Sequence, residues 1–148
     1  NRIRAILRDS VGAMWVATDG GLSHFTSDGA WEHFTAGNPF GEGLSFVTDL
    51  AEAQGALWVA TDNDGFYRFA GGKWKQWPAD GLSAAAVAPD GSAWFGLYYH
   101  GAGRFANEVW EQFQTKDGLI HPNVTDIYVD GSGTIWFATS GGVTRYVP

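Results

Sequence analysis

Short runs of strand-forming residues alternate with glycine-rich turns along the whole chain. The clearest runs are Trp-Val-Ala-Thr at 15–18 and 58–61 and Trp-Phe-Ala-Thr at 136–139, and their aromatic and branched residues favour strands. The first and last runs stop at Asp-Gly-Gly or Ser-Gly-Gly, where glycine permits a tight reversal of the backbone. A second short strand ending in an aromatic residue follows each run, so the pattern predicts β-hairpins. No helical periodicity lasts more than a turn or two.

The predicted hairpin recurs along the chain and marks an internal repeat. Its tryptophan appears as Trp15, Trp58, Trp94 and Trp136, about 40 residues apart, and a period of this length is the signature of a repeat architecture. The third copy is the loosest, because Trp-Phe-Gly at 94–96 and Leu-Tyr-Tyr-His at 97–100 replace the usual strand and turn.

Each repeat can be divided into four strands, which we name A to D in chain order. Strand A lies at 3–9 in the first copy and 124–130 in the fourth, and strand B carries the tryptophan. Strand C follows the turn, and strand D is Trp-Glu-His-Phe at 31–34, echoed at 74–77 and 110–113. A longer D–A connection leads to the next repeat and carries Gly-Leu at 43–44, 81–82 and 118–119. The fourth copy has strands A to C but no strand D before Pro148.

Units of four short strands predict an all-β fold, a β-propeller built from four-stranded antiparallel blades. We expect one domain over residues 1–148, with blades at approximately 1–44, 45–82, 83–120 and 121–148, the last lacking its outer strand. A sandwich or a closed barrel does not predict the same tryptophan in every unit. Strand A should be innermost and strand D outermost, and the four repeated tryptophans should be buried between neighbouring blades.

Composition narrows the function classes. The formal charge is −7 and the nine lysines and arginines are scattered, which argues against a nucleic-acid surface. No apolar run is long enough to span a bilayer, so we expect no membrane insertion. The absence of cysteine excludes disulfides and thiolate metal sites. Eight tryptophans, ten phenylalanines and five tyrosines supply a large aromatic core for one domain.

The repeat unit resembles the two-component regulator propeller repeat. The resemblance rests on the pattern Val-x-x-Ile-x-x-Asp-x-x-Gly-x-x-Trp-[Val/Phe]-[Ala/Gly]-Thr-x-Gly-Gly-[Leu/Val]-x-Arg-[Phe/Tyr], which the first and fourth copies fit best. Such repeats are typical of periplasmic or extracellular sensor regions of bacterial hybrid histidine kinases. The resemblance therefore implies a sensing or binding role outside the cytoplasm, and it implies no catalytic residue set.

The loops hold the candidate binding residues, because departures from a repeat mark positions that the framework does not require. In a propeller the B–C and D–A loops emerge on one face around the central channel. We expect ligand-binding residues there from the third and second B–C turns and the last D–A connection: Tyr98, Tyr99, His100, Asp62, Asn63, Asp64, His121 and Asn123. The same face should also hold Asp19, Ser140, Asn38, Phe40 and Phe46.

Catalytic and metal-binding arrangements are not indicated. The run Asp-Gly-Ser-Gly at 130–133 offers one carboxylate, whereas a calcium loop needs several, so we interpret it as a turn in which Asp130 accepts backbone hydrogen bonds. His24 stands where the other copies have Arg68, Arg104 and Arg145, which indicates a structural position. We expect no catalytic residues, no metal and no cofactor, while a weak metal site at 62–64 stays open.

Three function classes remain. The first is a non-catalytic ligand-binding or sensor propeller that takes a saccharide or another small polar ligand on the B–C and D–A loop face. The second is a propeller enzyme of the lyase or glycosidase type, which would need convergent acids or a paired histidine. The third is a structural protein-interaction module. For closure of the ring we expect a homodimer that forms an eight-bladed propeller, and the alternative is part of a longer propeller.

Overall fold

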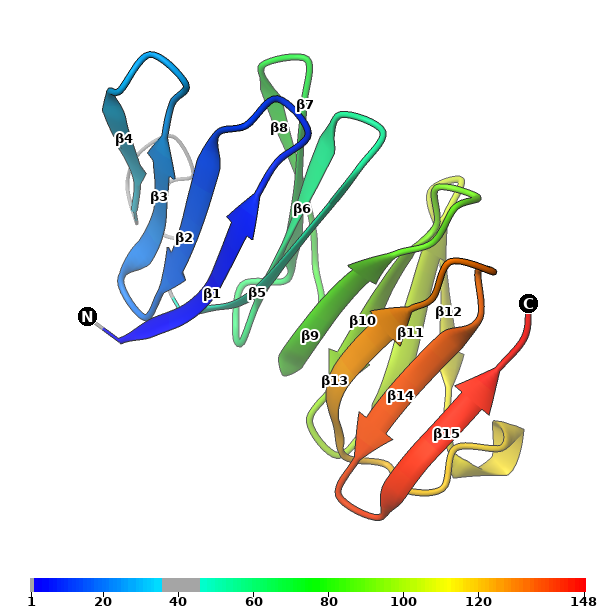
Figure 1. Ribbon diagram of the computed structural model, residues 1–148. Helices are drawn as coiled ribbons and strands as arrows, with labels where there is room; N and C mark the ends of the chain where they lie inside the picture. Colours follow the sequence, from blue (N-terminus) through cyan, green and yellow to red (C-terminus); the bar gives the residue numbers. More distant parts are fainter. Residues whose placement is uncertain (1, 36–45) are drawn as a thin grey trace.

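The computed structural model describes residues 2–35 and 46–148, which form four antiparallel sheets (Figure 1). The first sheet consists of β1 (Ile3–Arg8), β2 (Met14–Thr18), β3 (Gly21–Phe25) and β4 (Trp31–Phe34). The second consists of β5 (Val47–Ala53), β6 (Ala56–Thr61), β7 (Phe66–Ala70) and β8 (Lys73–Trp77). The third consists of β9 (Leu82–Val87), β10 (Ala93–Leu97), β11 (Gly101–Ala106) and β12 (Val109–Phe113). A short 3₁₀ turn, η1 (Thr115–Asp117), leads to β13 (Val124–Val129), β14 (Ile135–Thr139) and β15 (Gly142–Tyr146).

Each sheet is a meander, because consecutive strands pair and strand order follows chain order. The first strands β1, β5, β9 and β13 contact one another across neighbouring sheets, and β4, β8 and β12 form outer edges. Figure 1 shows the four sheets arranged as successive blades with these first strands innermost. The expected β-propeller fold is confirmed, with strand A inside and strand D outside.

The repeated tryptophans join each blade to the next. Trp15 is 2 % exposed, and its ring meets Phe69 and Trp74 of the second sheet at centroid distances of 5.8 and 6.3 Å. The same arrangement holds for Trp58 against Phe95 and Phe105, and for Trp94 against Phe137 and Tyr146. Edge-on and tilted aromatic pairs of this kind add to the stabilisation from burial alone. Burial between blades is therefore confirmed for three of the four tryptophans.

The expectation that Trp136 would be buried in the same way is wrong, because its ring is only partly buried. Its place in the repeat puts the indole on the flank of the fourth sheet where a following blade would pack. The described residues place no sheet there. The contacts of Trp136 with Arg145, at 5.8 Å, and with Asp130, at 3.0 Å, lie within its own sheet and turn. The repeat marks the framework position, but a neighbouring blade decides whether that position is buried.

The first sheet has the matching open flank. Ile3 and Ile6 on β1 are 57 % and 58 % exposed. Residues at the same register positions of β5, β9 and β13 are all buried: Val47, Leu82 and Val124 in place of Ile3, and Leu50, Ala85 and Ile127 in place of Ile6. Because the position is buried wherever a preceding blade is present, the exposure of β1 reflects an uncovered flank rather than a different local fold.

Candidate functional site

The turns between the second and third strands of all four sheets lie on one face of the molecule, drawn as its lower side in Figure 1. Main-chain hydrogen bonds connect the first three turns. The amide of Phe46 donates to the carbonyl of Asp19 at 3.0 Å, and the amide of Asp62 donates to the carbonyl of Phe46 at 3.1 Å. The amide of Gly81 donates to the backbone carbonyl of Asp62 at 2.7 Å, and the amide of Tyr98 donates to the carbonyl of Gly81 at 2.8 Å. This chain of bonds, which we call the backbone belt, sets the spacing of the turns.

A polar cluster lies at the inner end of this face. The guanidinium of Arg4, from β1, donates to the carboxylate of Asp19. This hydrogen bond raises the pKa of Arg4 above its ordinary value, and the charge of Asp19 and the nearby Tyr98 and Asp62 add to the effect. The four side chains come from the first three blades. We call this set of Arg4, Asp19, Asp62 and Tyr98 the inner cluster.

Arg4 is the member of the inner cluster that sequence reasoning missed. At the same position of the repeat the other blades carry Thr48, Ser83 and Thr125. A long cationic side chain among three short hydroxyl side chains is a departure from the repeat, and the same rule that selected Tyr98 could have found it. The departure was overlooked because it lies on a strand rather than in a turn.

The predicted binding residues do not all gather in one place. Tyr98 and Asp62 belong to the inner cluster, whereas Asn63 and Asp64 line a separate hollow of about 440 Å³ beside Gln76 at the second sheet. Tyr99 is 70 % exposed and has a positive φ of 62°, so its ring stands away from the core. The carbonyl of His100, in the same exposed turn, accepts a hydrogen bond from the Gln112 amide at 2.8 Å. Asn38 and Phe40 lie outside the described residues.

His121 and Asn123 take part in turn contacts of the fourth blade. The Nδ1 atom of His121 accepts the Asn123 amide at 3.1 Å, and the Asn123 side-chain amide donates to the Ser140 hydroxyl at 2.8 Å. The carbonyl of Asn123 accepts the Ser140 amide at 3.1 Å. The buried Asn123 Oδ1 atom has no hydrogen-bond partner within residues 2–35 and 46–148. These two residues therefore shape the last loop, and one side-chain oxygen can still accept a hydrogen bond.

Two aspartates lie on the innermost strands, a feature that sequence reasoning also missed. Asp49 on β5 and Asp126 on β13 both follow a break in strand register, and the signal was the repeated Val-Thr-Asp at 47–49 and 124–126. Asp49 accepts the amides of Leu50 and Ala85, each at 2.8 Å. Burial raises the pKa of Asp49 in spite of these hydrogen bonds, and the charge of Asp126 adds slightly to the shift.

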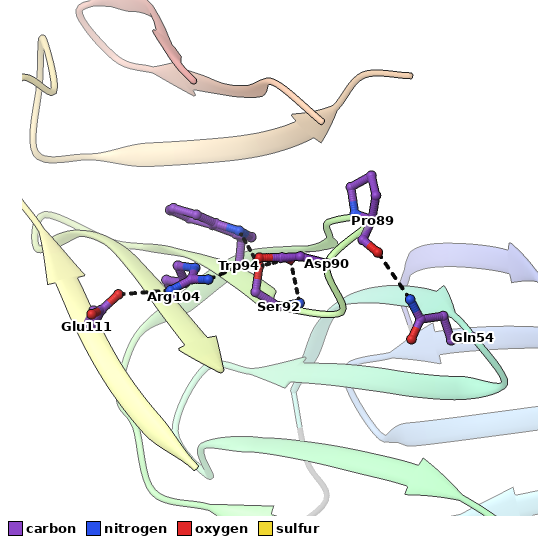
Figure 2. Close-up of polar contacts among 7 residues, drawn as sticks. All are labelled: Gln54, Pro89, Asp90, Ser92, Trp94, Arg104 and Glu111. Atoms are coloured by element: carbon purple, nitrogen blue, oxygen red, sulfur yellow. Dashed lines mark hydrogen bonds and ion pairs between the residues drawn. The ribbon is translucent and has the colours of Figure 1, made fainter. Parts of the chain in front are cut away.

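The face opposite the inner cluster carries framework interactions. Figure 2 shows Arg104 between Asp90 and Glu111, at 3.1 and 3.2 Å, with its guanidinium over the ring of Trp94. The figure also shows the side-chain amide of Gln54, from the second blade, donating to the carbonyl of Pro89 at 3.2 Å. The turn at 130–133 is as predicted, because Asp130 accepts the backbone amides of residues 132 and 134. Within the described ranges no group of three metal-ligating side chains is present.

Comparison with known proteins identifies the repeat. The family model described as two component regulator propeller matches residues 1–20 and 118–141, within the first and fourth copies. No curated protein sequence matches the chain. In the part of the chain that the structure describes, no helix has the length and apolarity needed to cross a bilayer.

Solved structures with the same fold include two extracellular domains from B. thetaiotaomicron. BT4673, described as a hybrid two component system, superposes with a TM-score of 0.82 at 21 % identity, covering 98 % of this chain and 21 % of its own. BT3049, described in the same way, gives 0.82 at 18 % identity over 100 % of this chain and 22 % of its own. This chain thus spans about a fifth of the length of those domains.

An enzyme also shares the fold. A catalytically inactive virginiamycin B lyase from Staphylococcus aureus, solved with quinupristin, superposes with a TM-score of 0.71 at 18 % identity. The superposition covers 99 % of this chain and 56 % of the lyase. At such identities the likeness concerns the fold, which hosts several functions. The family match shows two-component regulator propeller repeats at residues 1–20 and 118–141, and the four sheets show that the described residues share the propeller fold.

Proposed function

We propose that the chain is a non-catalytic ligand-binding module of a sensor propeller, and that its ligand is a saccharide or another small polar molecule. The observation that carries this proposal is the inner cluster. Arg4 and Asp19 form an ion pair on the loop face, and Asp62 and Tyr98 of the next two blades lie near enough for their charges to raise the pKa of Arg4. Binding residues commonly collect on loops that a rigid scaffold positions. The backbone belt holds their turns at a set spacing.

The chemistry of the cluster suits hydroxyl-rich ligands. The Arg4 guanidinium supplies several donors in a plane, and the two carboxylates supply acceptors. The side chains of Arg4 and Asp19 are 31 % and 29 % exposed, so both can reach a ligand. The exposed ring of Tyr98 offers an apolar surface near these polar groups. A few placed polar groups next to aromatic surface are the usual composition of a small-molecule site.

We also propose a periplasmic or extracellular location for the module. The proposal rests on the repeat family and on the two similar domains of B. thetaiotaomicron, which are described as extracellular. The acidic, cysteine-free composition is compatible with this location.

For the two open flanks we propose that the occupant is a second copy of this chain. The uncovered Ile3 and Ile6 present the surface that a preceding blade covers elsewhere, and Trp136 presents the surface that a following blade covers. We expect the contact between the two copies to resemble the three contacts between neighbouring blades within the chain. A two-fold pair would bury both flanks in an eight-bladed ring. In a longer propeller the same flanks would instead be covered by further blades of one chain.

The enzyme alternative rests on Asp49 and on the fold shared with a lyase. A raised carboxyl pKa on an inner strand is a feature of some catalytic acids. However, Asp49 is hydrogen-bonded to backbone amides, and the described contacts give it no histidine partner. We therefore rank binding above catalysis, and product analysis after incubation with each bound glycan tests the alternative.

The proposal is tested by a glycan array, followed by titration calorimetry of each hit. Replacing Arg4 by Thr gives the first blade the residue that two other blades carry at this position, so the fold should tolerate it. We expect affinity to fall by at least about tenfold, equal to about 1.4 kcal/mol. The control is Val109→Thr, a change at an exposed position of β12.

A second variant replaces the whole Tyr-Tyr-His turn at 98–100 by a short Asp-Gly turn, and this change should abolish binding. Unchanged affinity in both site variants would contradict the proposed site.

A further inference from the structure

A cavity of about 320 Å³ lies between the first and second blades, on the face opposite the inner cluster. Its walls are mostly apolar, with the rings of Trp15 and Phe69 and the side chain of Leu57. Two carboxylates, those of Asp9 and Glu52, also line it. A volume of this size is at the lower end of the range for small-molecule sites.

The other three blades carry an arginine at the strand C position that faces the strand B tryptophan. Arg68, Arg104 and Arg145 pair directly with the strand B tryptophan of their own blade. Their guanidinium carbons lie 5.7 to 5.9 Å from the centre of that tryptophan ring, which is a favourable cation–π distance. In the third blade the guanidinium also bonds the turn aspartate, Asp90, and the strand D glutamate, Glu111 (Figure 2). In the third blade a planar cation therefore lies between the tryptophan and two acidic groups.

The first blade has His24 in place of this arginine. The imidazole stacks on Trp15 with centroids 3.8 Å apart and planes inclined by 12°. Its Nδ1 atom lies 3.0 Å from the Glu32 carboxylate on β4, so the side chain engages the outer strand. The buried Nε2 atom has no hydrogen-bond partner among the described residues. His24 therefore satisfies the strand D acid but leaves the turn acid, Asp9, without the cation that Asp90 has in the third blade.

The carboxylates of the cavity are held by neutral groups. Asp9 accepts the amides of Val11 and Ala13 and the indole N–H of Trp15, at 2.8 to 3.1 Å. Glu52 accepts the Ser10 hydroxyl at 3.0 Å and the Gly55 amide at 3.2 Å. No lysine or arginine is among the described residues that line the cavity. Among the described residues neither carboxylate has a direct ion pair, and the nearby Arg8 guanidinium lies against Gly12 in the same turn.

We propose that this cavity binds a small organic cation in which an amidinium, guanidinium or ammonium group is joined to an apolar body. The charged group lies near Asp9 and Glu52, as the Arg104 guanidinium lies near Asp90 in the third blade. The apolar body lies against Phe69 and against the accessible edges of Trp15 and Leu57, which are 2 % and 3 % exposed. Hydrogen bonds between charged partners are stronger than neutral ones. This site is independent of the loop face and of the function proposed for it.

Benzamidine is a suitable probe, because it joins a planar amidinium to a single aromatic ring. Titration calorimetry should detect one benzamidine site per chain. Benzamide has the same shape without the charge, and benzoate carries the opposite charge. If charge complementarity determines affinity, both should bind at least about tenfold more weakly than benzamidine. Equal binding of benzamide and benzamidine would overturn the proposal, as would the absence of benzamidine binding at millimolar concentration.

The decisive variant is His24→Arg, which gives the first blade the residue of the other three. The new guanidinium should occupy the cavity, so that benzamidine affinity falls by at least about tenfold while thermal stability is kept or raised. The matched control is His33→Arg, which adds the same side chain at an exposed position of β4 and should leave binding within about twofold. Retained binding in His24→Arg would refute the site.

A second variant keeps the test valid if His24→Arg folds poorly. Glu52→Gln keeps the shape of the side chain and an acceptor for Ser10 and Gly55 but removes one negative charge. Benzamidine binding should weaken by at least about threefold, in line with loss of a partly exposed charge partner, whereas benzamide binding should not change. If both ligands respond equally to Glu52→Gln, the charge plays no part in recognition and the proposal is wrong.

Discussion

Replacing Trp94 or Trp136 by Ala compares the same framework position with and without a following blade. Trp94 is fully buried, and its ring meets Phe137 and Tyr146 of the fourth sheet at 5.8 and 5.5 Å. A buried tryptophan covers at least about 150 Å², worth about 4 kcal/mol at 25 cal/mol per Å². The measured range for such truncations is about 3–5 kcal/mol, which includes the cavity left behind. We expect Trp94→Ala to lie in this range.

The expected cost for Trp136→Ala is smaller. The ring is partly exposed on an open flank, so its removal leaves no enclosed cavity and loses less buried area. The cation–π contact with Arg145 and the hydrogen bond to Asp130 are lost, and interactions of this kind at accessible sites are individually weak. We therefore expect a loss of about 1–2 kcal/mol, the usual range of single substitutions.

Urea unfolding followed by far-ultraviolet circular dichroism measures both variants, with the slope checked for two-state behaviour. The measurement is made at low and at high protein concentration. If a second copy covers the flank, the cost of Trp136→Ala should grow with concentration, because association stabilises only the folded state. A cost for Trp136→Ala equal to that of Trp94→Ala at the lowest concentration would refute the open flank. A cost below about 0.5 kcal/mol for Trp94→Ala would refute its place in the core.

Three further predictions concern the turns and the closure of the ring. Hydrogen bonds from Ser132 and Trp136 hold the pKa of Asp130 far below its unfolded value of 3.8. The ionised Asp130 side chain therefore contributes its full stabilisation above pH 3.8 and loses it as the pH falls. In urea unfolding, the loss of stability caused by Asp130→Asn should therefore become smaller in acid. Gly65→Ala should be much more destabilising than Gly55→Ala in the same assay. Both glycines have positive φ, but the new Cβ would lie 2.0 Å from the Trp77 carbonyl oxygen at Gly65 and in open space at Gly55. Light scattering should give a dimer at micromolar concentration, and a stable monomer would contradict closure by a second copy.

The framework could be predicted from the sequence because it repeats. The period of the tryptophans and the turns after strand B predict four hairpins, and the structure has them at those positions. The environment of Trp136 could not be predicted, because burial depends on the next blade rather than on the residues of its own repeat. His24 was interpreted as a structural position, and in the structure its imidazole lies 3.0 Å from the Glu32 carboxylate. The cavity beside His24 could not be predicted, because it depends on how Asp9 and Glu52, which belong to two different blades, lie relative to each other.

The candidate site was predicted only in part. Tyr98 and Asp62 are turn residues that depart from the repeat, and both lie in the inner cluster. Arg4 was missed because attention to loops left out a departure on a strand. Asp49 was missed because its burial depends on a strand 36 residues further along the chain, whose Ala85 amide it accepts. Sequence patterns within one repeat carry no information on such contacts between repeats.

The backbone belt has a consequence for how this kind of module can diversify. Its links join amide and carbonyl groups of Asp19, Phe46, Asp62, Gly81 and Tyr98, and no side-chain atom takes part in them. Substitutions in the turns can therefore alter the exposed chemistry while the distances between turns are inherited unchanged. Under the proposed binding function, such a division would let the ligand preference change through single substitutions in the turns, with the scaffold that presents them kept.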